Sequence, residues 1–88
     1  MIRRRVVVHG RVQGVFFRDT LRRAARSRAV AGWARNNSDG TVEAVFEGER
    51  EGVEAMVRLC EEGPRGASVD RVDVAEEEPE GLDGFRVS

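Results

Sequence analysis

A glycine turn followed closely by an arginine is the feature of this sequence that most directly suggests chemistry. The string VQGVFFR runs from Val12 to Arg18, between an alternating apolar segment and a helix-like one. Backbone N–H groups at the start of a helix lack partners within it, and successive N–H groups around a glycine form a nest for phosphate-like oxygens. Gly10 and Gly14 would leave room for the anion, and the planar guanidinium of Arg18 could hold two of its oxygens. These residues predict an anion site, with an ordinary turn and a solvated Arg18 as the alternative.

Asn36 is a second candidate, at the start of the turn-rich string NNSDG. Asparagine is common in hairpin turns, so this residue alone predicts no more than a turn. Whether it belongs to the same site as Arg18 depends on where the fold places the two.

Apolar periodicity and turn residues predict seven elements. Apolar positions alternate along the expected strands and follow helical spacing in the expected helices. The Asp39-Gly40 pair predicts a tight hairpin turn, Gly32 is expected to end the first helix, and Gly63-Pro64 the second. The predicted strands are 4–12, 33–37, 41–47, 68–74 and 84–87, and the predicted helices are 19–29 and 50–62.

This order, βαββαβ with a short extra C-terminal strand, predicts an α+β fold, the ferredoxin-like sandwich, as one domain over residues 1–88. Two right-handed crossovers would give an antiparallel sheet with both helices on one face. The first strand would be central, between the third and the fourth, with the second strand parallel to it and two positions away. The ends of the first and second strands, at Gln13 and Asn36, would then share one edge, roughly 10 Å apart. A phosphate-sized ligand and a water molecule would fill that gap.

Length and cysteine content restrict the class of protein. Eighty-eight residues allow one small core. No window approaches the length of a membrane span, and the apolar run that ends at His9 is too short for a signal peptide. The single cysteine, Cys60, cannot form an internal disulfide, which suits a reducing compartment and predicts a cytoplasmic protein.

The basic residues are all arginine and are concentrated in the first part of the chain. The absence of lysine excludes a P-loop lysine and Schiff-base chemistry. Residues 1–35 hold ten arginines and one acid, a net charge of +9, whereas residues 36–88 hold five arginines and fifteen acids, a net charge of −10. The two halves are expected to fold against each other, so that much of the field cancels. A nucleic-acid-binding module without catalysis is the alternative function, although Glu43 and Glu47 on one strand face would repel phosphates.

The other chemically capable residues predict structural roles. His9 is the only histidine and is expected on a sheet face, and Cys60 falls in the apolar stripe of the second helix. The acidic run Glu76 to Glu80 reads as a solvated connection rather than a metal site.

Two longer motifs resemble a known family. The pattern V-x-G-x-V-Q-G-V-x-F-R from Val8 to Arg18 resembles the first signature of acylphosphatases, and G-W-A-R-N-x-x-x-G-x-V from Gly32 to Val42 resembles the second. The resemblance extends to the closing DRVDV and GF segments and so covers the whole chain.

The resemblance implies a metal-independent hydrolase, without a cofactor, that converts acyl phosphates into a carboxylate and inorganic phosphate. It implies that Arg18 binds the phosphoryl group together with loop N–H groups, and that Asn36 holds the attacking water. The implied phosphate-binding loop consists of Gln13, Gly14, Val15, Phe16, Phe17 and Arg18. Because an acyl phosphate already has a good leaving group, positioning and charge stabilisation can suffice. We therefore expect a free-standing, monomeric enzyme with a small acyl phosphate as substrate and phosphate or sulfate as anion ligand. A domain of a larger maturation protein is less expected, and neither nucleic acid nor a membrane is an expected partner.

Overall fold

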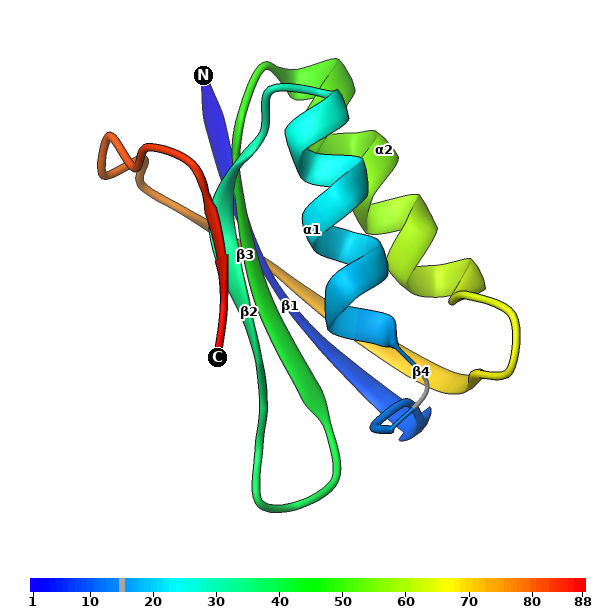
Figure 1. Ribbon diagram of the computed structural model, residues 1–88. Helices are drawn as coiled ribbons and strands as arrows, with labels where there is room; N and C mark the ends of the chain where they lie inside the picture. Colours follow the sequence, from blue (N-terminus) through cyan, green and yellow to red (C-terminus); the bar gives the residue numbers. More distant parts are fainter. Residues whose placement is uncertain (15) are drawn as a thin grey trace.

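A computed structural model describes residues 1–14 and 16–88 of the chain (Figure 1). Five strands and two helices follow one another in the predicted order. They are β1 (Ile2–Arg11), α1 (Phe17–Ser27), β2 (Ala31–Asn36), β3 (Val42–Gly48), α2 (Arg50–Glu62), β4 (Ser68–Glu77) and β5 (Phe85–Val87).

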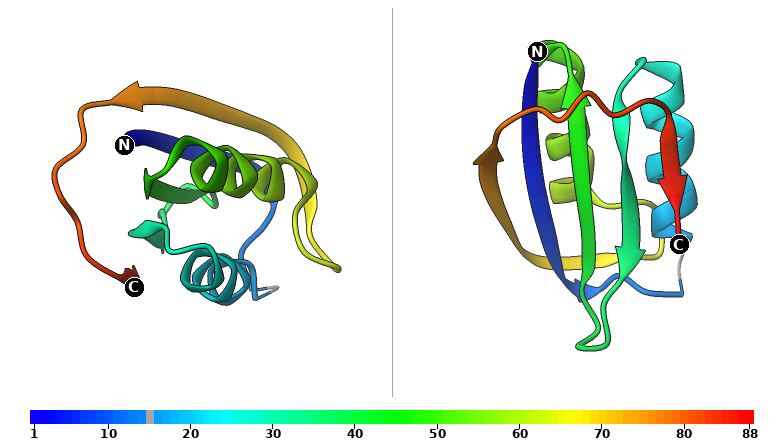
Figure 2. Two further views of the ribbon diagram at one scale, coloured as in Figure 1. Left: turned by 90° about the horizontal axis from the view of Figure 1, so that it is seen from above. Right: turned by 90° about the vertical axis from the view of Figure 1, so that its left-hand side faces the viewer.

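The strands form one mixed sheet in the order β4-β1-β3-β2-β5. β1 pairs antiparallel with β3 and β4, and β2 pairs antiparallel with β3, so the predicted central position of β1 is confirmed. Both helices cover one face of the sheet, which gives the predicted ferredoxin-like sandwich (Figure 2). The pairing of β5 could not be inferred from its sequence: it lies parallel to β2, with Gly32 beside Phe85.

The core lies between the helices and the covered face of the sheet. Each helix contributes a buried stripe with helical spacing: Phe17, Leu21 and Ala25 from α1, and Val53, Met56 and Cys60 from α2. Complete burial of side chains of this size stabilises the fold by roughly 1.5–3 kcal/mol each for the larger ones. Burial also raises the pKa of the Cys60 thiol, as expected for a packing residue. Within the described residues, neither helix has the length and apolar character needed to cross a membrane.

The first helix begins and ends two residues earlier than predicted. It begins at Phe17 rather than residue 19 because the Phe17 side chain joins the buried stripe, 2% exposed. It ends through Ala29, which has φ 55° and lets Val30 N–H donate to Ala25 O at 2.8 Å and Ala29 N–H to Arg26 O at 3.4 Å. This is the Schellman pattern with alanine in the usual glycine position, so Gly32 is not the residue that ends the helix.

The fourth strand continues three residues beyond its predicted end at residue 74, because arginines of β1 pair with its last glutamates. Arg4 Nη2 lies 3.1 Å from Glu76 Oε1. The two oxygens of Glu77 accept from Arg3 Nε at 2.8 Å and Arg5 Nε at 2.6 Å. The acidic run is therefore partly a strand that joins the basic and acidic halves of the sequence.

The segment 78–84, called the strap below, crosses the sheet face opposite the helices and connects the two outer strands, β4 and β5 (Figure 2). It is held by Glu47 of β3, whose side chain is almost fully buried. The carboxylate accepts the backbone N–H groups of three successive strap residues, Glu80 at 2.8 Å, Gly81 at 2.8 Å and Leu82 at 2.7 Å. Burial alone would raise the pKa of Glu47, but these hydrogen bonds and one from Arg3 outweigh it and hold the pKa below its ordinary value.

We expect Glu47→Gln to lower the free energy of unfolding by about 1–3 kcal/mol at neutral pH, because the amide cannot accept all of the strap N–H groups. The folded pKa is lower than the unfolded one, so this stabilisation is complete above the unfolded value of about 4.3 and is lost as the pH falls through the folded value. Urea denaturation at several pH values should therefore show a steeper loss of stability on acidification for the parent chain than for the variant.

The matched control is Glu78→Gln, at an exposed position of the same strap. It should change the free energy of unfolding by less than about 0.5 kcal/mol. Equal effects of the two substitutions would contradict the role given to Glu47.

Candidate active site

The start of α1 has backbone N–H groups that no side chain caps. Phe16 directly precedes the helix with φ 59° and ψ 25°, and its carbonyl accepts the Thr20 N–H at 3.0 Å. No side chain caps this helix end, so the N–H groups of the first turn face the space in front of α1. Gly14 has φ +75°, and an added Cβ would meet nothing within 4 Å, so its glycine is required by the backbone turn.

Gly10 has a different role from the one expected. A Cβ at this position would lie 2.2 Å from the carbonyl oxygen of Ser68, on the neighbouring strand β4. The pairing between β1 and β4 shifts register at the same place, between His9 and Gly10. Gly10 therefore permits close strand approach and does not make room for an anion.

Gln13 connects the loop to the hairpin that follows β2. Its Nε2 donates to the Asn37 carbonyl at 2.7 Å and to the Thr41 carbonyl at 3.0 Å. The hairpin is closed by further bonds, from Asn37 N–H to Thr41 O at 2.9 Å and from Thr41 N–H to Asp39 Oδ1 at 3.0 Å. The side chain of Gln13 thus positions the hairpin, and only its backbone remains as a donor to a ligand.

Asn36 ends β2 at the edge of the sheet that carries this loop. It pairs with Val42 of β3, and Val42 pairs on its other side with Val8 of β1. Because side chains alternate along a strand, Asn36 shares a face with the fully buried Ala34, which is the helix-covered face. Its exposed side chain therefore lies on the same side of the sheet as the start of α1.

A cavity of about 290 Å³ brings the loop and Asn36 together. Its described lining residues are Val12, Gly14, Phe16, Phe17, Arg18, Asp19, Arg22, Asn36 and Val87. Of the residues predicted to form the site, Gly14, Phe16, Phe17, Arg18 and Asn36 line it. Gln13 lies behind the cavity in contact with the hairpin, and Val15 lies outside the described residues.

Arg18 lies in the first turn of α1, where its guanidinium is held by the end of the chain. Its Nη1 donates to the carbonyl oxygen of Ser88, and the Ser88 N–H donates to Ala34 O of β2 at 3.1 Å. Val87 of β5 thus lines the cavity, and Ser88, directly after this strand, orients the arginine.

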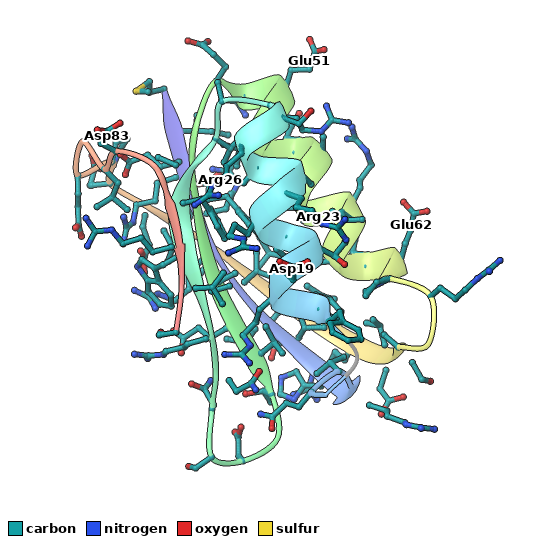
Figure 3. All side chains as sticks on the ribbon, viewed as in Figure 1. Asp19, Arg23, Arg26, Glu51, Glu62 and Asp83 are labelled. Carbon is teal, nitrogen blue, oxygen red and sulfur yellow. The ribbon has the colours of Figure 1, made fainter. Side chains whose placement is uncertain are left out.

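Two charged lining residues were missed by the sequence analysis, Asp19 and Arg22. Asp19 Oδ1 accepts from Arg22 Nη2, and Asp19 Oδ2 lies 3.3 Å from Arg23 Nε (Figure 3). The i, i+3 and i, i+4 spacing of these residues could have indicated the pairs. The Asp19 carboxylate is shared by Arg22 and Arg23, so it does not neutralise the charge of Arg18. The cavity therefore suits an anion.

His9 lies on the opposite face of the sheet from the cavity, as predicted. Its Nε2 is 2.8 Å from Asp73 Oδ2 and 3.2 Å from Arg71 Nη2. Among residues 1–14 and 16–88, no three His, Cys, Asp or Glu side chains are grouped as metal ligands.

Comparison with known proteins identifies close relatives over the full chain. The family model described as Acylphosphatase matches residues 4–87. An acylphosphatase of Natronomonas pharaonis is 55% identical over 86 residues, which cover 98% of this chain and 94% of that one.

Two solved structures extend the likeness to three dimensions. The crystal structure of an acylphosphatase from Bacillus subtilis superposes with a TM-score of 0.95 at 35% identity, covering 100% of this chain and 99% of that one. Full-length HypF, in a phosphate- and nucleotide-bound form, superposes with a TM-score of 0.91 at 30% identity over 99% of this chain but only 12% of its own.

We expect inorganic phosphate to bind this cavity and stabilise the protein. At about ten times its dissociation constant, phosphate should add about 1.4 kcal/mol of stability and raise Tm by about 5–10 °C. Arg18→Ala should abolish the shift, whereas Arg58→Ala, at an exposed position of α2, should keep it. A phosphate-induced shift that is the same in both variants would place the anion elsewhere.

Proposed function

The chain belongs to the acylphosphatase family, whose members hydrolyse acyl phosphates, and from this premise we propose how its cavity performs that hydrolysis. The proposal is direct, metal-independent attack of a water molecule held by Asn36 on a phosphoryl group held by Arg18 and the loop N–H groups. The observation that carries it is the single cavity lined by Arg18, the start of α1 and Asn36.

Arg18 and the backbone supply the positive potential that the reaction needs. Negative charge is spread over the phosphoryl oxygens in the transition state, so donors fixed in advance stabilise it without rearrangement. The guanidinium of Arg18 is oriented by Ser88, and the first-turn N–H groups of α1 are held by the helix itself. Gln13, Gly14, Val15, Phe16 and Phe17 would contribute through their backbone N–H groups.

Asn36 is proposed to position the water. It extends from β2, whereas the phosphate-binding loop follows β1, and β3 lies between these two strands. The cavity that Asn36 and the loop share would hold a water molecule beside the bound phosphoryl group. The Gln13 side chain, which donates to two hairpin carbonyls, maintains the spacing.

The cavity contains no free base among its described lining residues, and the chemistry does not require one. The ionisable ones are Arg18, Asp19 and Arg22, and Asp19 is paired with Arg22 and Arg23. The leaving group is a carboxylate, whose conjugate acid has a pKa of about 4, so it departs at neutral pH without being protonated. Positioning and charge stabilisation are the contributions left for the protein.

Nucleic-acid binding on the sheet face is not favoured. Glu43 and Glu47 lie on this face, and the strap covers part of it. Trp33, the aromatic residue there, lies between two guanidiniums, 5.4 Å from Arg5 and 5.0 Å from Arg35. The volume of the cavity, about 290 Å³, suits a small substrate.

We expect the purified protein to hydrolyse benzoyl phosphate in EDTA. Arg18→Ala should lower kcat/KM by at least about 1000-fold, and Asn36→Ala by about 100-fold, because each removes a preorganised group of the transition state. Arg58→Ala should leave it unchanged. Parent activity no higher than the uncatalysed rate would overturn the proposal.

Hydrolysis in ¹⁸O-labelled water tests the site of attack. Attack at phosphorus places the label in inorganic phosphate, whereas attack at the carbonyl carbon places it in benzoate. Label in benzoate would refute the roles proposed for Arg18 and Asn36 even if turnover were fast.

A further inference from the structure

Phe16 is exposed and held in an unusual backbone conformation at the mouth of the cavity. Its side chain is 81% exposed, and its φ of 59° lies in the left-handed region. Bulky residues rarely adopt this conformation, because Cβ crowds the backbone. The chain therefore presents a large apolar ring to water at a strained position.

The fold does not explain why a phenylalanine occupies this position. Ala29, which also has a positive φ, ends α1 through hydrogen bonds of the Schellman type. The conformation of Phe16 directs the loop, but glycine or asparagine would adopt it more readily. Strained residues of this kind concentrate at ligand sites, where the conformation serves binding.

A second exposed apolar side chain borders the same cavity. Val87 of β5 is 36% exposed, and it lines the cavity together with Phe16 and Arg18. These two residues come from opposite ends of the sequence and from different elements, the loop before α1 and the last strand. Their apolar side chains are parts of the lining that a phosphoryl group, bound by charge, would not use.

We infer that Phe16 and Val87 bind the acyl part of the substrate and favour aromatic or bulky apolar acyl groups over acetyl. This inference rests on the proposed function. The acyl group is joined to the phosphoryl group through a single oxygen, so it must lie within a few ångströms of the groups that hold the phosphate. An aromatic ring there would stack on Phe16, and a branched chain would contact both side chains.

The test compares kcat/KM for benzoyl phosphate and acetyl phosphate. Phe16→Asn removes the ring but retains a residue that tolerates a positive φ. It should lower the benzoyl-to-acetyl ratio of kcat/KM about five- to tenfold, the effect of leaving about 50 Å² of apolar surface in water. The loss should appear mainly as a higher KM for benzoyl phosphate, because the acyl contact is equal in the ground and transition states. Phe16→Tyr should restore the parent ratio.

Val87→Thr provides a second variant outside the loop, with nearly the same shape. It should also lower the ratio, by about two- to threefold. Val74→Thr is its control, since Val74 is 45% exposed on β4, at the other edge of the sheet. This control should leave both substrates unaffected. Inhibition by inorganic phosphate, measured in each variant, reports separately whether the anion site is intact. If Phe16→Asn abolishes this inhibition, the benzoyl-to-acetyl ratio of Val87→Thr is the result that tests the acyl-binding role.

The outcomes separate this inference from the proposed function. If neither substrate is hydrolysed above the uncatalysed rate, the proposed function fails. If both are hydrolysed and the ratio stays within twofold of the parent value in Phe16→Asn and Val87→Thr, only the acyl-binding role is overturned.

Discussion

The architecture of the site depends on one set of hydrogen bonds. The buried carboxylate of Glu47 accepts the N–H groups of three successive strap residues. β4 and β5 lie at opposite edges of the sheet, so the strap must cross an entire face to connect them. Glu47 fixes that crossing. It thereby delivers Phe85 to the core, where its ring stacks on Phe46 with centroids 5.8 Å apart. Ser88, directly after this strand, supplies the carbonyl that orients Arg18.

Burying Glu47 beside Arg3 is costly in itself, and a buried ion pair is weak grounds for stability. The contribution of Glu47 is to fix which residues of the strap lie beside β3. Arg3 also pairs with Glu77 and Glu80, so β1 is joined to the end of β4 and to the strap at one point. Arginines of the first part of the chain therefore position the acidic second part: Arg3, Arg4, Arg5 and Arg35 pair with glutamates of β3, β4 and the strap.

The elements and their order in the sheet could be predicted from local sequence patterns. Alternation and the helical stripes specify the strand order, and that order brings Asn36 to the loop before α1. The predicted tight turn centred on Asp39 and Gly40 was wrong: Gly40 N–H donates to Asn37 O at 3.2 Å, so Ser38 and Asp39 are the central residues, and of the predicted pair only Gly40 has a positive φ. Three of the misjudged features depend on contacts between distant segments. Gly10 is required by the approach of Ser68, the end of β4 by arginines more than 70 positions away, and the parallel pairing of β5 by a strap whose sequence carries no strand signal. Val87 could not be assigned to the cavity before that pairing was known.

The sheet is also the rigid framework that the proposed reaction would need to hold a water molecule and a phosphoryl group relative to each other. Asn36 pairs with Val42, and Val42 pairs with Val8, so backbone hydrogen bonds of the sheet fix Asn36 relative to β1, and the loop continues from the end of that strand. Gln13 adds a direct connection between the loop and the hairpin after Asn36. Reactions limited by positioning benefit most from such rigidity, because a displacement of about 1 Å can cost about 100-fold in rate. An acyl phosphate needs neither a strong base nor protonation of its leaving group, so it is the kind of substrate that the proposed arrangement of one arginine and one asparagine at a rigid sheet edge would hydrolyse.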